Sequence, residues 1–169
     1  IAGDIGGTKT HLALYEGSRC IKDEKFHSHE FSGLVDIIRK FHSEKIDKAC
    51  FGIAGPVRDG RCKATNLPWI IDAKELSSEL KISKVSLIND LEATAWGIRC
   101  LKPVEFAVLN EGVVQKGNQA VIAAGTGLGE AGLYWDGSKH HPFSCEGGHT
   151  DFAPTNEQEI ALWHYLKKK

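Results

Sequence analysis

Two glycine-rich turns carry residue types that suit phosphate binding. The first turn lies within residues 3–9, Gly-Asp-Ile-Gly-Gly-Thr-Lys. Two adjacent glycines can direct several backbone N–H groups at one point, and a phosphate satisfies those donors. Thr8 adds a hydroxyl, and Asp4 adds a carboxylate that can hold hydrated Mg²⁺. The alternative interpretation is a plain hairpin turn that needs its glycines for positive φ angles.

The second turn repeats this chemistry in residues 124–129, Ala-Gly-Thr-Gly-Leu-Gly. It is not a dinucleotide fingerprint, because a second strand rather than a helix is expected to follow it. It is not a Walker loop either, since no Gly-Lys-Ser/Thr ends it. Two such hairpins, one in each half of the chain, favour a nucleotide held between two domains.

A candidate catalytic carboxylate lies between the two turns in the sequence. Asn89 and Asp90 follow the apolar residues 85–88 at the end of an expected strand. Ligands of α/β sheets lie at the carboxyl ends of strands. Asp90 can therefore accept a proton from a substrate hydroxyl that attacks phosphorus. The alternative is that Asp90 only caps the following helix.

Glu146 and His149 surround two glycines in residues 145–150. A glutamate accepts hydrogen bonds, whereas a histidine can donate and accept, so the pair suits the hydroxyls of a polyol. The alternative is a loop salt bridge between the two side chains.

Metal and redox chemistry have weaker support. The other histidines and the five scattered cysteines show no Cys-x-x-Cys pair and no recognisable ligand spacing. We therefore expect reduced thiols, ordinary surface histidines and a cytoplasmic protein.

The elements that position these residues follow from hydrophobic periodicity and capping signals. The expected helices begin at the caps Ser32, Asp72 and Thr155, the last two with Glu75 and Gln158 as capping-box partners, and a further helix covers residues 91–100. The expected strands flank the first turn and cover residues 49–53, 85–88, 120–124 and 131–135. This alternation predicts a mixed α/β sheet with helical crossovers. Pro103 marks an expected boundary between domains 1–102 and 103–169.

Composition limits the class of partner. The chain has 169 residues, a formal net charge of −1 and 41% hydrophobic residues, which is a globular balance. We expect no nucleic-acid or membrane partner, because there is no large basic field and no apolar stretch of about 20 residues. Methionine is absent, so we expect the chain to be a piece of a longer protein.

Seven segments, in family order along nearly the whole chain, resemble the bacterial-type glucokinases of the sugar kinase, Hsp70 and actin superfamily. They are residues 3–8, 52–57, 66–69, 88–90, 125–129, 146–149 and 151–154. The resemblance implies a ribonuclease-H-like (actin-like ATPase) small domain followed by the start of a second α/β domain. It also implies ATP-dependent phosphorylation of glucose at the 6-hydroxyl, with Mg²⁺, in a protein that is a homodimer at full length.

The resemblance also assigns roles to individual residues. The phosphate loops correspond to Gly3, Asp4, Ile5, Gly6, Gly7 and Thr8, and to Gly125, Thr126 and Gly127. The sugar-binding residues correspond to Asn66, Asn89, Asp90, Glu146 and His149, with Asp90 as catalytic base and Asp4 holding Mg²⁺ through water. Residues 151–169 contain no cysteine, which favours the zinc-free glucokinase branch over the related ROK sugar kinases and repressors.

Two alternatives remain open at this point. One is a kinase for another hexose, and the other is a sugar-responsive regulator that keeps the fold without catalysis. Against the regulator, Asp90 and both phosphate loops are present, and we expect no basic helix-turn-helix before Ile1.

Overall fold

The computed structural model describes residues 1–64, 66–125 and 127–169 and contains three sheets. The first part of the chain contains β1 (Ala2–Ile5), β2 (Lys9–Glu16), β3 (Arg19–His27), η1 (Ser28–Glu30), α1 (Leu34–Phe41), β4 (Lys48–Ile53), β5 (Val57–Arg58), β6 (Arg61–Lys63), β7 (Ile70–Asp72), α2 (Ala73–Leu80) and β8 (Lys84–Asn89). The remainder contains α3 (Asp90–Ile98), η2 (Pro103–Glu105), β9 (Gln119–Ala124), β10 (Leu128–Trp135), β11 (His140–Cys145), η3 (Gly147–His149) and α4 (Glu157–Leu166).

The first sheet has the strand order β3-β2-β1-β4-β8. β3, β2 and β1 are antiparallel neighbours, whereas β4 and β8 continue the sheet in parallel with β1. The parallel pairs need crossover connections, and α1 and α2 lie in those connections. The expected mixed α/β sheet with helical crossovers is therefore confirmed.

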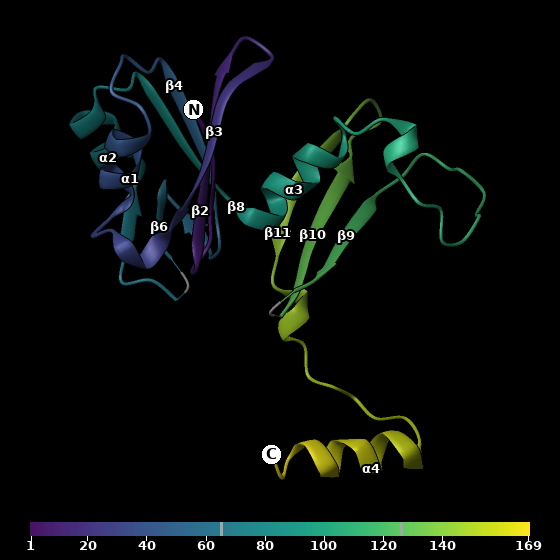
Figure 1. Cartoon of the computed structure of the whole chain (residues 1–169). Helices are drawn as coiled ribbons and strands as arrows, with labels where there is room; N and C mark the ends of the chain where they lie inside the picture. The colour runs from purple at the N-terminus through teal and green to yellow at the C-terminus, as the bar shows by residue number, and fades with distance from the viewer. Residues whose placement is uncertain (65, 126) are drawn as a thin grey trace.

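One face of this sheet and the helices α1 and α2 enclose the main hydrophobic core (Figure 1). The core includes Ile5, Leu12 and Phe51 from the sheet, Ile37 and Ile38 from α1, and Leu76 from α2. These apolar residues alternate with polar ones along β2 and recur at helical spacing in α1, as burial of one face requires. The opposite face of the sheet is consequently left for polar side chains.

The helix caps agree with the sequence in one case and differ in two. Asp72 caps α2 as predicted, accepting hydrogen bonds from the backbone N–H groups of Lys74 and Glu75. At α1 the prediction was wrong, because Gly33 holds the N-cap position and the Ser32 hydroxyl donates to the Asp36 carboxylate instead.

At α4 the predicted pair, Thr155 with Gln158, was displaced by one residue. Asn156 holds the N-cap and accepts from the backbone N–H of Glu159, 3.0 Å away. The Glu159 carboxylate in turn accepts from the backbone and hydroxyl of Thr155. Two neighbouring polar residues could each serve as cap, and the dihedral angles of the chain decide between them.

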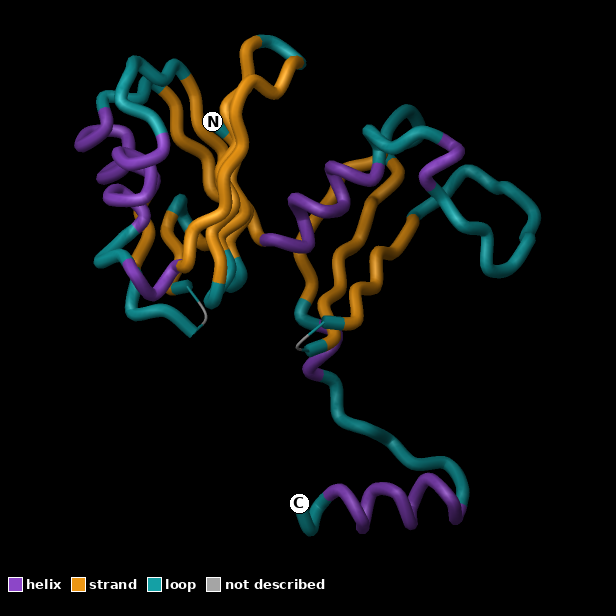
Figure 2. The backbone as a smooth tube through the Cα atoms, viewed as in Figure 1, coloured by secondary structure: helices purple, strands orange, loops and turns teal. Residues whose placement is uncertain are grey.

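The second sheet has the order β11-β10-β9, and α3 packs against it (Figures 1 and 2). Leu91 and Ala95 of α3 form a small core with Val121 of β9 and with Ala131 and Leu133 of β10. α3 also approaches the first sheet, since a Cβ on Gly52 of β4 would lie 2.9 Å from the Cβ of Ala93. The domain boundary at Pro103 stays a prediction. Residues before Pro103 already pack against the second sheet, because Leu91 of α3 belongs to its core.

The last helix, α4, lies apart from both sheets at the end of an extended segment (Figure 2). None of the helices formed by the described residues is both long and apolar enough to cross a membrane.

Candidate active site

The first predicted phosphate loop is the turn between β1 and β2. The backbone N–H of Gly6 donates to the carbonyl of Lys9 at 3.0 Å and closes the turn. Neither Gly6 nor Gly7 has a positive φ angle, so this hairpin does not use its glycines for left-handed backbone. Gly3 has a different role, because a Cβ there would lie 2.7 Å from both Leu12 and Phe51 in the core.

Asp4 lies on the polar face of the first sheet. It is exposed and stands opposite His11 of β2 and Gly52 of β4 in the strand register, and opposed residues share a face. Desolvation by the surrounding protein raises the pKa of Asp4, and the nearby charge of His11 lowers it. The carboxylate is thus directed away from the core and toward the side of the sheet on which α3 lies.

Asn89 and Asp90 lie where β8 passes directly into α3. The Asn89 side chain caps the helix by accepting from the N–H groups of Leu91 and Glu92 at 2.9 and 3.3 Å. Its amide donates to the carbonyl of Gly55 at 3.2 Å, and the residue is buried. The cap is therefore Asn89, and the interpretation of Asp90 as a mere cap is not supported.

The Asp90 carboxylate accepts a hydrogen bond from the N–H of Leu91 at 2.9 Å. Burial raises the pKa of Asp90, the hydrogen bond from Leu91 lowers it, and the negative charges of Asp4 and Glu146 raise it. The fold consequently brings Asp4 and Glu146, which are far from Asp90 in the sequence, within electrostatic range of Asp90. These surroundings increase the affinity of Asp90 for a proton, as a general base requires.

The second predicted phosphate loop connects β9 to β10. The N–H of Gly125 donates to the carbonyl of Gly127 at 2.9 Å, while Thr126 lies outside the described residues. Apart from the chain neighbours, no atom of the described residues lies within 4 Å of a Cβ built on Gly125 or Gly127, so these two positions are not packed against other described parts of the chain.

The loop that holds Glu146 and His149 packs against the start of β10. A Cβ on Gly148 would lie 1.9 Å from the carbonyl oxygen of Leu128, and that oxygen cannot move without moving the strand. Glycine is therefore required at 148 to hold this loop beside the second turn. Glu146 and His149 approach to 3.6 Å and are 62% and 86% exposed, so the loop salt bridge forms when His149 is protonated.

Asn66 is not joined to this group by any hydrogen bond or ion pair among the described residues. It is exposed and adopts a left-handed backbone with φ of 63° in the loop between β6 and β7. Among the described residues, charge effects relate Asp4 and Glu146 to Asp90, and the role of Asn66 stays a prediction.

Two residues near the site were not predicted from the sequence. Cys62 of β6 is buried, and its thiol pKa is raised by burial and by the charge of Asp90, which lies nearby. No local pattern around Cys62 indicates that it lies near Asp90. His11 could have been found by counting outward from the turn, because the pairing of Ile5 with Thr10 puts Asp4 opposite His11.

The described residues hold no group of three or more His, Cys, Asp or Glu side chains suited to a metal ion. Hydrated Mg²⁺ does not need such a group, because it keeps several waters and binds through one or two carboxylates and substrate phosphates. Asp4, exposed beside the first turn, fits that requirement.

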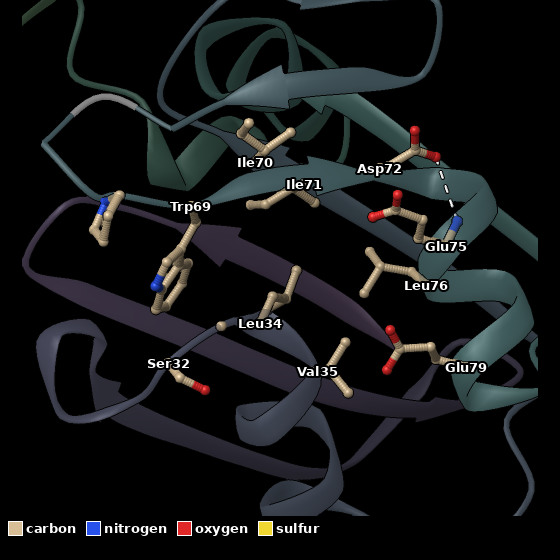
Figure 3. Close-up of a pocket in the computed structure, with 12 residues that line it drawn as sticks. Ser32, Leu34, Val35, Trp69, Ile70, Ile71, Asp72, Glu75, Leu76 and Glu79 are labelled. Atoms are coloured by element: carbon tan, nitrogen blue, oxygen red, sulfur yellow. Dashed lines mark hydrogen bonds between the residues drawn. The ribbon is translucent and has the colours of Figure 1, made fainter.

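A separate hollow of about 270 Å³ lies between α1, β7 and α2 (Figure 3). Leu34, Trp69, Ile71 and Leu76 line it, and they belong to the core on the face of the sheet opposite Asp4. None of the candidate residues lines this hollow, so it is not part of the candidate site.

The fold places this chain among proteins of the actin-like ATPase fold, as two similar solved structures show. A glucokinase from an Antarctic psychrotroph is 28% identical with a TM-score of 0.80, and the match covers 99% of this chain and 56% of that one. A glucokinase from Balamuthia mandrillaris in complex with glucose is 25% identical with a TM-score of 0.71, covering 98% and 52%.

The family model described as Glucokinase matches residues 1–169, and the chain belongs to the glucokinase family. A glucokinase of Nostoc punctiforme is 42% identical over 179 residues, covering 100% of this chain and 52% of the relative. The chain thus spans about half the length of the curated relatives it matches.

Proposed function

We propose that the full-length protein transfers the γ-phosphoryl group of ATP to the 6-hydroxyl of glucose. The observation that carries this proposal is the position of Asp90, at the junction of β8 and α3, with Asp4 and Glu146 near enough to raise its pKa. Membership of the glucokinase family supports the substrate and the reaction class.

The chemistry is an in-line displacement in which the sugar oxygen bonds to the γ-phosphorus as the bond to the bridging oxygen of ADP breaks. Asp90 accepts the proton of the attacking hydroxyl. The turns at residues 3–8 and 125–127 bind the phosphates, and Thr126, outside the described residues, belongs to this assignment. Mg²⁺, when bound, neutralises phosphate charge, and Asp4 would hold it through water.

Asn89, Glu146 and His149 bind the sugar hydroxyls in this proposal, and Asn66 is assigned the same role by its motif. Asn89 can do so with the amide hydrogen that Gly55 does not engage, since each amide carries two donors. We further propose a cytoplasmic homodimer that uses glucose and ATP and has no nucleic-acid or membrane partner.

The test is Asp90→Asn in the full-length enzyme, assayed for glucose 6-phosphate formation with Mg·ATP. We expect kcat to fall by about 10²–10⁴-fold, the usual contribution of a general base, while glucose still binds. Glu92→Gln, on the same helix turn, is the matched control and should keep kcat. A nearly normal kcat in Asp90→Asn would remove Asp90 from the role of base.

A further inference from the structure

The polar face of the first sheet carries a row of side chains that extends beyond Asp4. In the strand register His11 of β2 lies between Asp4 of β1 and Lys25 of β3. Cβ atoms of residues opposed in this way are about 4.5–5.5 Å apart, so the side chains of neighbouring strands meet. The row therefore connects the edge of the sheet to the candidate site.

The His11 ring is held from the side remote from Asp4. Its Nε2 lies 3.0 Å from the carboxylate of Asp23, two residues along β3 from Lys25. Since Asp23 stands opposite Ala13, it shares the polar face with His11. This hydrogen bond fixes one ring nitrogen, and the described residues form no hydrogen bond with the other.

Asp4, by contrast, accepts no side-chain hydrogen bond from the described residues. Its nearest charged neighbour across the strand pair is His11, whose charge lowers the pKa of Asp4. Asp4 in turn affects the pKa of Asp90. His11 is thus the side chain that stands opposite Asp4 across the β1–β2 pair and is itself hydrogen-bonded to Asp23 of β3.

We propose that His11, oriented by Asp23, is a positioning residue that holds the Asp4 carboxylate toward the metal-bound phosphates of the nucleotide. The proposal rests on the assignment of Asp4 to the hydrated Mg²⁺ in the proposed function. Side chains that orient a metal-binding carboxylate typically change metal affinity or activity by about 10–100-fold when they are removed.

The test measures the binding of ADP to the full-length protein by calorimetry, with Mg²⁺ and with a chelator. We expect His11→Ala to weaken the affinity for Mg·ADP about tenfold, at the lower end of that range, and to leave the affinities for metal-free ADP and for glucose within about twofold. His29→Ala, an exposed histidine of η1, is the matched control and should change none of the three affinities.

Two further variants distinguish a positioning role of His11 from a general loss of folding. His11→Arg should restore the affinity for Mg·ADP, because a guanidinium has donors for both Asp23 and Asp4. Asp23→Asn should weaken the affinity for Mg·ADP in the wild-type background but have little further effect on His11→Ala, as expected of residues that act as one unit.

The outcomes distinguish this inference from the proposed function. If the wild-type protein binds no Mg·ADP, the proposed function fails. If the wild-type protein binds Mg·ADP and His11→Ala binds it equally well, the positioning role is wrong and the nucleotide assignment stands. Equal losses with and without Mg²⁺ would also overturn the positioning role.

Discussion

Asp90 combines a half-buried position with two negatively charged neighbours. Burial opposes its ionisation, and the charges of Asp4 and Glu146 oppose it further, while hydrogen bonds from the backbone N–H groups of Leu91 and of Asp90 itself favour it. The net direction is a raised pKa, so the carboxylate takes up a proton more readily than an ordinary surface aspartate.

This direction predicts the pH dependence of the reaction. Because kcat requires ionised Asp90, it falls as the pH falls through the pKa of this group. Glu146→Gln removes a negative charge and lowers that pKa, so we expect the acid limb of the kcat profile to move to lower pH. Glu157→Gln, exposed on α4, should leave the limb in place. If the acid limb of the kcat profile does not move in Glu146→Gln, the carboxylates of Asp90 and Glu146 are not close enough to interact.

At the scale of the element, the junction of β8 and α3 serves both structure and chemistry. Asn89 satisfies two N–H groups of the first helical turn and also binds the loop at Gly55. The direction of α3, and with it the position of Asp90, therefore depends on this one side chain.

We expect Asn89→Ala to cost about 1–2 kcal/mol of unfolding free energy, as the loss of an N-cap does. It should also lower kcat by roughly 10–100-fold, since small displacements of a catalytic group are costly. Asp72→Ala removes the equivalent cap of α2, away from the site, and should lower stability without changing kcat. Urea denaturation measures the free energy of unfolding, and steady-state kinetics measure kcat. An equal kcat in Asn89→Ala and Asp72→Ala would show that the Asn89 cap does not position Asp90 for catalysis.

At the scale of the whole molecule, α3 separates two sheets that carry different parts of the site. The first sheet carries Asp4, and the second carries the turn at 125–127 and the loop with Glu146. Because the small core of the second sheet includes Leu91 and Ala95, we expect α3, and Asp90 at its start, to be coupled to the second sheet more strongly than to the first.

Hydrogen exchange of two buried-leucine variants tests this coupling. Leu133→Ala in the second core should cost about 2–5 kcal/mol locally and reduce the protection of α3, while β1 and β4 stay protected. Leu12→Ala, equally buried in the first core, should reduce the protection of β1 and β4 and leave α3 protected. Loss of protection in α3 with Leu12→Ala alone would assign the helix to the first sheet.

The polar residues of the site could be predicted because turns, caps and strand ends have local signals. Glycine pairs, a strand that ends at Asn89, and the Glu-Gly-Gly-His loop are all visible in the sequence. The caps of α1 and α4 were less predictable, because two adjacent residues that are both common N-caps compete for one position, and only the backbone angles select Gly33 over Ser32 and Asn156 over Thr155.

The sequence by itself determined the family and six of the strands, because each depends on residues close together in the chain, and the choice of Asp90 stays a prediction. It did not predict β3, β5, β6, β7 and β11, which the described residues also form. Tertiary structure decided what surrounds Asp90, since Asp4, Cys62 and Glu146 reach it only through strand pairing and the packing of α3. It also decided that Gly3, Gly52 and Gly148 are required for close packing rather than for turn geometry. The physical reason is that burial and long-range charge depend on contacts between residues distant in the sequence, and local patterns carry no record of those contacts.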